Sequence, residues 1–235
     1  MKQLQKQASE ESQRRPMDVL IAFLTRHRTT IMITVGVIVV AVVALIIVLS
    51  VQNTRTERSL AAVDELREDF DDWLESDAQA QEAAYDLLAE DAASIIDSYP
   101  GTYAAARARL IEANALVELE RWEEAAGIFL EVAEGTSDTY LAPVSLMDAA
   151  IALEHAGDSD RALVIHQRLA DEYGDNTAEV PRALFSIGRL NEQADRVADA
   201  AEAYRRLIDD YPASSWTNLA RNRIITLTVE GRIGG

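Results

Sequence analysis

Two stretches of the sequence share one joint: "SIIDSYPGTY" at residues 94–103 and "RRLIDDYPASSW" at residues 205–216. In both, an amphipathic segment ends at a Tyr-Pro pair, and a new segment opens just after it with Ser or Thr. Proline ends a helix, whereas Ser and Thr favour the cap position before the next one. The recurrence of this joint predicts a repeated helical unit.

The spacing inside the unit indicates its type. Three alanines each stand four residues before a ring-bearing residue: Ala125 before Phe129, Ala162 before His166 and Ala200 before Tyr204. Twelve residues before each of these alanines stands another small residue, namely Ala113, Ala150 and Gly188. This is the pattern of the tetratricopeptide repeat, a hairpin made of a first helix (helix A) and a second helix (helix B). The small residues let helices A and B cross closely, and the ring fills the gap to the next hairpin.

The repeat period is longer than usual. It is 37 or 38 residues here, against a standard of about 34. Because the spacing from helix A to helix B is the standard one, we expect the additional residues between helix B and the next helix A. The positions equivalent to the Tyr-Pro tyrosine are Tyr99, Thr136, Tyr173 and Tyr211.

The sequence therefore predicts an all-α protein with a solenoid of about four tetratricopeptide-like hairpins and a C-terminal capping helix. The expected hairpins are 57–76 with 79–98, 102–119 with 121–134, 141–156 with 159–173, and 178–193 with 196–210, followed by a cap at about 214–230. Such a cap covers the apolar end of a solenoid.

A single transmembrane helix is expected before the repeats. From Ile31 to Val51 the chain has 21 residues without a charge, and fifteen of them are Ile, Val or Leu. As a helix this stretch is about 32 Å long, which matches a hydrocarbon core of about 30 Å. The apolar region of a cleaved signal peptide is shorter, about 7–15 residues, and is followed by a small-residue cleavage site. We therefore expect an uncleaved anchor.

The charge distribution predicts the orientation of this anchor. Residues 1–51 hold six basic and three acidic groups, whereas residues 52–235 hold 16 basic and 37 acidic groups. Arg26 and Arg28 flank the apolar stretch on its N-terminal side. The positive-inside rule places that side in the cytoplasm and the repeats across the membrane.

Three domains follow from these observations. We expect a cytoplasmic tail with a juxtamembrane amphipathic helix at residues 1–29, a transmembrane helix at 30–52 and an exported repeat domain at 53–235. Within the tail, residues 1–15 are expected to be disordered, and "PMDVLIAFLTRHR" is expected to lie in the membrane interface.

The layout resembles that of the YfgM-like family, the ancillary subunit of the bacterial Sec translocon. The resemblance rests on the short tail, "FLTRHRTTI" leading into one span, and long-period repeats with "RRLIDDYPASSW". It implies a bacterial inner-membrane protein with a periplasmic repeat domain, associated with Sec translocon subunits, periplasmic chaperones or translocating clients.

The sequence offers little catalytic chemistry. It has no cysteine, no glycine-rich phosphate loop, no nucleophile elbow and no zinc motif. The three histidines read as a membrane-boundary residue (His27), a helix-end residue (His155) and a core residue (His166). A net charge of −18 argues against nucleic acid. We expect a non-enzyme without cofactor, metal or small-molecule substrate.

Partner proteins are expected on the concave face, which the A helices line. The expected groove residues are Arg107, Leu110, Asn114, Glu118, Met147, Ile151, Glu154, His155, Arg182, Phe185, Arg189 and Glu192. Among them Leu110, Met147, Ile151 and Phe185 are expected to be exposed apolar groups that suit a peptide segment. Two alternatives stay open: the cap helix packs over Phe185 and Arg189, or the first hairpin fills the groove.

Three functions fit this architecture. The first is an interaction scaffold at the translocon. The second is an adaptor for another envelope machine, such as cell division, cell-wall synthesis or outer-membrane assembly. The third is a sensor that signals inward, against which stands a cytoplasmic tail of about 28 residues without a recognisable domain.

Overall fold

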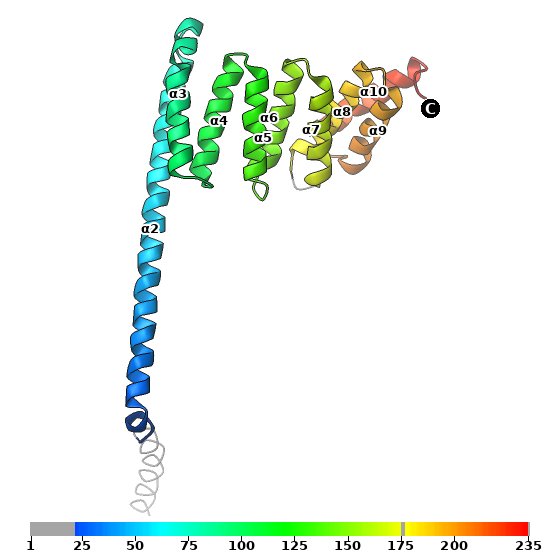
Figure 1. Ribbon diagram of the computed structural model, residues 1–235. Helices are drawn as coiled ribbons and strands as arrows, with labels where there is room; N and C mark the ends of the chain where they lie inside the picture. The colour runs from blue at the N-terminus through cyan, green and yellow to red at the C-terminus, as the bar shows by residue number, and fades with distance from the viewer. Residues whose placement is uncertain (1–21, 175–176, 235) are drawn as a thin grey trace, which may run out of the picture. The chain divides into compact units, whose positions relative to one another are not determined.

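The computed structural model describes residues 22–174 and 177–234 (Figure 1). Its helices are α2 (Arg28–Leu74), α3 (Ala78–Ser98), α4 (Tyr103–Glu118), α5 (Trp122–Gly135), α6 (Leu141–His155), α7 (Ser159–Glu172), α8 (Glu179–Gln193), α9 (Val197–Asp210) and α10 (Ser215–Val229). The expected disorder of residues 1–15 and the expected interfacial helix up to residue 21 lie outside the described residues. The chain forms two compact units, one up to Glu57 and one from Arg58.

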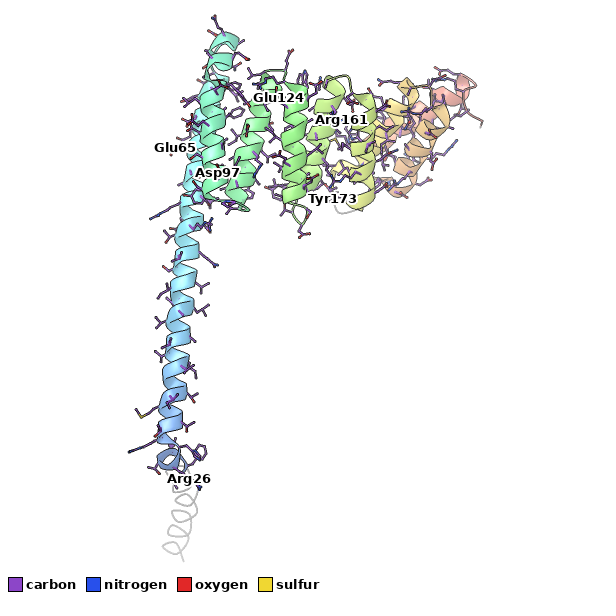
Figure 2. All side chains as sticks on the ribbon, in the orientation of Figure 1. Arg26, Glu65, Asp97, Glu124, Arg161 and Tyr173 are labelled. Carbon is purple, nitrogen blue, oxygen red and sulfur yellow. The ribbon has the colours of Figure 1, made fainter. Side chains whose placement is uncertain are left out.

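The first unit contains the apolar helix. Residues 22–26 are helical, the chain turns at His27, and α2 begins at Arg28. In the described part of the chain, α2 is the one helix whose length and composition suffice to cross a membrane, with a mean hydropathy of 3.3 in an 18-residue window. None of that window is buried, and side chains project from it on all sides (Figure 2). An apolar surface of this extent needs lipid or protein around it.

The second unit is a row of antiparallel helical pairs, which confirms the predicted solenoid (Figure 1). The end of α2 pairs with α3, then α4 with α5, α6 with α7 and α8 with α9, and α10 follows as the cap. The helix ends agree with the predicted ends to within two residues, except that the first helix has no separate start because α2 runs on from Arg28.

The turn inside each clear hairpin is closed in the same way. It is three residues long, and its middle residue is left-handed, with φ of 55° at Glu120, 82° at Gly157 and 57° at Asp195. The next amide reaches back across the helix end, as in the 2.8 Å bond from Arg121 N to Leu116 O. This Schellman closure satisfies the last carbonyls of helix A. A constant turn explains the constant spacing of twelve residues between the small residues of helices A and B.

The Tyr-Pro joints are the ends of the B helices. The C-cap residues of α3, α5, α7 and α9 are Tyr99, Thr136, Tyr173 and Tyr211. The segments from helix B to the next helix A vary in length, whereas the turns inside the hairpins do not. The additional residues of each repeat therefore lie where they were predicted. Pro143 and Pro181 lie in the first turns of α6 and α8, where a missing amide costs no helical bond.

Small residues lie where the helices of a pair cross. Ala125, Ala162 and Ala200 are fully buried, as predicted. Gly188 is the tightest point, because a Cβ there would lie 2.3 Å from Cε1 of Tyr204. The Tyr204 ring occupies this space, and its hydroxyl donates to Glu192 Oε2 at 3.2 Å. Glycine is the only residue that leaves room for the ring.

The first hairpin has its own anchors. Val63, Leu66 and Trp73 of α2 are buried in one core cluster with residues of α3. The indole Nε1 of Trp73 donates to the carbonyl of Gln81 at 2.9 Å, and the guanidinium of Arg121 lies 4.7 Å from the ring centre of Tyr85. These contacts tie the first hairpin to the rest of the solenoid.

We expect Gly188→Ala to lower the free energy of unfolding by about 2 kcal/mol, because overpacking forces the Tyr204 ring to move. Urea unfolding followed by circular dichroism measures this. The matched control is Gly127→Ala in α5, where a Cβ meets nothing within 4 Å. This control should gain about 0.5–1 kcal/mol from helix propensity. Equal effects of the two substitutions would contradict the crossing geometry.

Candidate functional site

A cavity of about 380 Å³ lies among α6, α8 and α10. It is lined by Ile151, Glu154, His155, Arg182, Phe185, Ser186, Arg189 and Trp216. Six of these were predicted as groove residues from the repeat offsets, and the fold brings them together. Ser186 and Trp216 were not predicted. We name this feature the A-helix cavity.

Trp216 of α10 forms the third wall of the A-helix cavity. Its ring centre lies 5.4 Å from that of Phe185, which also contacts Tyr204 at 5.6 Å. The cap helix thus covers part of Phe185, one of the two alternatives left open by the sequence, but it borders the cavity and does not fill it. The spacing from the small residue of each helix A could not identify Trp216, because α10 lies beyond the last predicted hairpin.

Glu154 organises the polar wall of the cavity. Its Oε1 lies 3.0 Å from Nε2 of the fully buried His166, and its Oε2 accepts from Nη2 of Arg189. Burial raises the pKa of the Glu154 carboxyl, but the hydrogen bonds from His166 and Arg189 outweigh it, and the pKa is lowered. The charged carboxylate therefore fixes Arg189 in place at the cavity.

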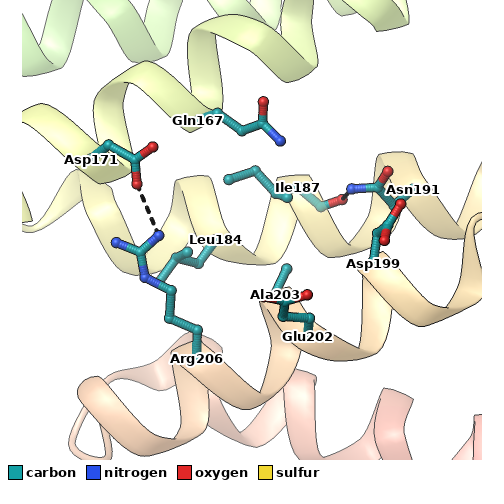
Figure 3. A pocket seen from close by; sticks show the side chains of 9 residues that line it. All are labelled: Gln167, Asp171, Leu184, Ile187, Asn191, Asp199, Glu202, Ala203 and Arg206. Atoms are coloured by element: carbon teal, nitrogen blue, oxygen red, sulfur yellow. Dashed lines mark hydrogen bonds and ion pairs between the residues drawn. The ribbon is translucent and has the colours of Figure 1, made fainter.

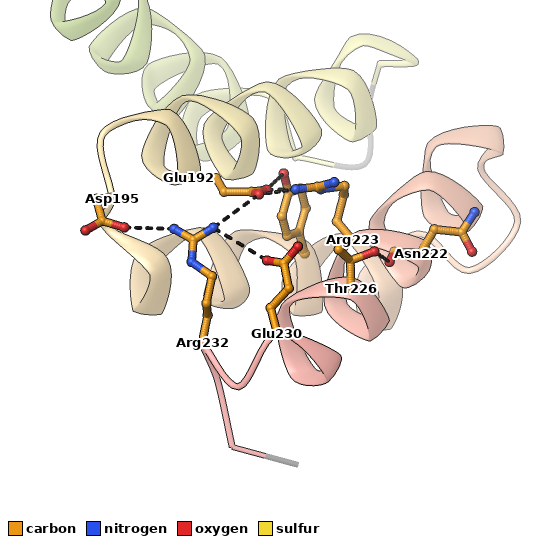
Figure 4. A network of polar contacts seen from close by, with 8 residues as sticks. Glu192, Asp195, Asn222, Arg223, Thr226, Glu230 and Arg232 are labelled. Carbon is orange, nitrogen blue, oxygen red and sulfur yellow. Dashed lines mark hydrogen bonds and ion pairs between the residues drawn. The ribbon is translucent and has the colours of Figure 1, made fainter.

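The same arrangement recurs one repeat later, at Glu192. Tyr204 and Arg223 donate to its carboxylate, and Arg232 lies 3.7 Å away (Figure 4). The prediction that Glu192 is available for a partner is wrong, since its side chain is only 11% exposed and joins α8 to α9 and α10. Its physical role is to pair with the partly exposed guanidinium of Arg223 and to accept a hydrogen bond from the Tyr204 hydroxyl.

Met147 is a second correction. It was expected to be an exposed apolar group, but it is 1% exposed and packs in a core cluster with Leu146, Leu169 and Ala183. The reason is that this position on α6 faces the junction with α7 and α8. Ile151, one turn later, is only partly buried and reaches the cavity.

The predicted residues on α4 lie apart from the A-helix cavity. Arg107, Leu110, Asn114 and Glu118 are exposed or half-buried, and none of them lines it. Leu110 packs instead against a small core cluster of Ala106, Val132 and Leu141. The four α4 residues therefore form at most a separate part of the groove.

Two exposed tyrosines accompany Arg107, and the sequence had not singled them out. The hydroxyls of Tyr103 and Tyr140 lie 3.2 Å apart, from equivalent positions 37 residues apart in consecutive repeats. The hydrogen bond with Tyr103 raises the pKa of Tyr140, whereas the charge of Arg107 lowers it. The signal that would have found the pair is the recurrence of Tyr ten residues before Ala113 and ten residues before Ala150.

A second cleft lies among α7, α8 and α9 (Figure 3). It has a volume of about 270 Å³, with Leu184, Ile187 and Ala203 below an acidic rim. At one end Arg206 spans it by pairing with Asp171 at 3.0 Å. None of the predicted groove residues lines it. Across residues 22–174 and 177–234, no group of three metal-ligating side chains occurs.

The pKa of the Asp148 carboxyl, on α6, is raised to about 6. Desolvation is the main cause, Glu179 adds to it, and Arg182 opposes it. The folded state therefore favours the neutral acid. This contribution to stability is fully present below about pH 4 and is lost as the pH rises through about 6.

We expect Asp148→Asn to stabilise the protein by about 1–2 kcal/mol at pH 7.5, because it removes a partly desolvated charge. The gain should vanish below about pH 4, where Asp148 is neutral in both folded and unfolded states. Thermal unfolding at several pH values measures it. The control is Asp91→Asn on the exposed face of α3, and a gain equal to the control at pH 7.5 would contradict the assignment.

Two family comparisons and one relative bear on this architecture. Residues 182–214 match the tetratricopeptide repeat. A TPR repeat-containing protein of Treponema pallidum (strain Nichols) is 32% identical over 129 residues, which cover 55% of this chain and 53% of that protein. The chain thus spans about half the length of this relative. Residues 22–165, more than half of the chain, match the tetratricopeptide repeat-like domain, and this match includes the apolar helix. The chain belongs to the tetratricopeptide repeat-like domain family.

Proposed function

We propose that this protein is a non-catalytic scaffold, anchored in a membrane, that holds a segment of another envelope protein in the A-helix cavity. The tetratricopeptide repeats imply protein–protein interaction. The observation that carries the proposal is the cavity itself, in which Ile151, Phe185 and Trp216 present apolar surface beside charged groups. Partly apolar grooves of this kind accept peptide segments.

The proposed location is the bacterial inner membrane, with residues 53–235 in the periplasm. Support comes from the exposed apolar part of α2 and from Arg26 and Arg28 on its N-terminal side. The likeness in layout to the YfgM-like family supports a partner at the Sec translocon: one of its subunits, a periplasmic chaperone or a translocating client. An adaptor role at another envelope machine differs only in the partner.

The topology is tested with reporter fusions. An alkaline phosphatase fused after Gly235 should be active, because it folds only outside the cytoplasm, whereas the same enzyme inserted after Arg15 should be inactive. A cytoplasmic reporter should give the opposite pattern. Activity of the phosphatase at residue 15 alone would reverse the proposed orientation.

The partner is tested by photo-crosslinking in intact membranes. A benzoylphenylalanine at His155, which is exposed beside the cavity, should capture a partner, whereas one at Arg161 on α7 should not. Mass spectrometry of the product identifies it. A translocon subunit, a chaperone or a client would support the first role, and a cell-wall or outer-membrane assembly protein would support the adaptor role.

The site is tested with matched substitutions in the crosslinking strain. Ile151→Asp places a charge at the lining of the cavity, and Val164→Asp places the same charge on α7 at a side chain that is 59% exposed. We expect the first to reduce the crosslink at least fivefold and the second to leave it unchanged. Ser186→Trp, which fills the cavity without a new charge, should act like Ile151→Asp. A crosslink that persists in both folded cavity variants means that the partner is held elsewhere.

A further inference from the structure

The cap helix α10 carries exposed apolar side chains on its outer side. All four Leu, Ile and Val side chains of α8 are buried, whereas three of the five in α10 are exposed. These are Leu219, Ile225 and Val229, which are 46%, 60% and 82% exposed. At 3.6 residues per turn they lie within about 120° of one another, and we name them the outer face of α10. Because a helix that ends a repeat array in water needs a polar outer side, this exposure indicates a contact surface.

The place of α10 in the row explains this exposure. Each earlier helix A of a clear hairpin lies between two B helices, as α6 does between α5 and α7 and α8 does between α7 and α9. α10 packs against α9 and α8 on one side, where Thr217, Ala220 and Leu227 are buried. No helix follows it among residues 230–234, the last that the structure describes. The outer face of α10 therefore lacks the second neighbour that α6 and α8 have.

The charge of α10 is opposite to that of the exported part as a whole. Ser215–Val229 contains Arg221 and Arg223 and no acidic residue, although residues 52–235 hold 37 acidic against 16 basic groups. Arg223 pairs with Glu192, whereas the exposed Arg221, one turn before Ile225, forms no ion pair within 4 Å in the described part of the chain. A surface that offers apolar side chains beside carboxylates therefore complements the outer face of α10.

The chain itself carries such a surface on α3. Ala78–Ser98 holds five acidic residues and no basic one. Its exposed side consists of small or apolar residues at helical spacing, with carboxylates beside them: Ala80, Ala83, Ala84, Leu87, Asp86, Glu90 and Asp91. Leu87 is 64% exposed, and the alanines leave room for another helix to approach closely. This side of α3 thus combines an uncovered apolar side chain with the charge that α10 lacks.

The two surfaces cannot meet within one molecule, because α3 and α10 lie near opposite ends of the row of helices in the second unit (Figure 1). They can meet between two copies of the chain. A contact of α10 with α10 would bring arginines together, and a contact of α3 with α3 would bring carboxylates together. Charge complementarity therefore favours a head-to-tail contact, in which two different surfaces meet.

We propose that α10 of one copy docks on α3 of a second copy of this chain. The outer face of α10 covers Leu87 and the alanines around it, and Arg221 pairs with a carboxylate of α3. Each copy keeps one free surface of either kind, so the contact continues from copy to copy as an open row. The proposal does not depend on what the A-helix cavity holds.

The first test exploits a sequence without cysteine. Two full-length chains with different tags, one with Asn222→Cys on α10 and one with Ala83→Cys on α3, are produced in the same membranes and oxidised. We expect about tenfold more disulfide between the two different chains than between identical ones. Val164→Cys on α7, used in place of Asn222→Cys, is the matched control and should give no disulfide with the Ala83→Cys chain.

Three outcomes would overturn the proposal. A dominant disulfide between two Asn222→Cys chains would show a symmetric contact. Capture of a different protein alone by the α10 cysteine would show that the outer face of α10 belongs to another partner. The absence of any disulfide between the two chains would show that the two surfaces do not meet.

The second test measures self-association of the full-length protein in detergent by sedimentation velocity. Ile225→Glu combined with Val229→Glu on α10 should weaken it about tenfold or more, and so should Leu87→Glu on α3, because each variant places a charge at the contact. Val164→Glu, at a side chain that is 59% exposed on α7, is the matched control and should change it less than about twofold.

Mixing the two kinds of variant distinguishes a head-to-tail contact from a symmetric one. The Leu87→Glu chain keeps an intact α10, and the α10 variant keeps an intact α3, so one contact can form between them. We expect dimers in the mixture and no larger species, although each folded variant alone is monomeric. A mixture that stays monomeric would overturn the proposal, while the crosslink at His155 separately tests the proposed function.

Discussion

The close crossing of two helices in each hairpin is the constraint on which the rest of the structure depends. Ala125, Ala162 and Ala200 are fully buried at these crossings, and Gly188 leaves no room even for a methyl group beside the Tyr204 ring. In the last hairpin this close approach brings the Tyr204 ring against Gly188 and Phe185 of α8. The stacking of hairpins, the position of the A helices on one face and the cavity between them follow from that approach.

The sequence was informative where the physics is local. Small residues, ring positions and Tyr-Pro joints recur at fixed spacing because each reports a contact inside one hairpin or at its end. The hairpins, their ends and six of the eight cavity residues could therefore be predicted. The sequence misled where contacts join different repeats: Met147 is buried at the junction with α7 and α8, and Glu192 is engaged by α9 and α10. Trp216 lies beyond the last full repeat, so no periodic rule could place it at the cavity.

Charge pairing distinguishes the C-terminal repeats. A carboxylate that is largely removed from water is unfavourable unless it is paired and fully hydrogen-bonded. Glu154 meets this condition through His166 and Arg189, and Glu192 meets it through Tyr204 and Arg223. The oxygens of both carboxylates are occupied by these contacts, whereas Arg189 and Arg223 still have N–H donors that are not used. The cavity of this acidic protein therefore offers mainly the hydrogen-bond donors of arginine side chains.

Val117 occupies on α4 the position that Glu154 and Glu192 occupy on α6 and α8, and it is part of the apolar packing of the first core cluster. Among the described residues, the ion pairs that join successive repeats thus begin at α6. The stability of a repeat array is approximately the sum of its repeats and of the interfaces between neighbours. Interfaces with and without ion pairs therefore contribute unequally to it. The A-helix cavity lies among the helices that carry these ion pairs, because Glu154 at its edge joins α6 to α7 and α8.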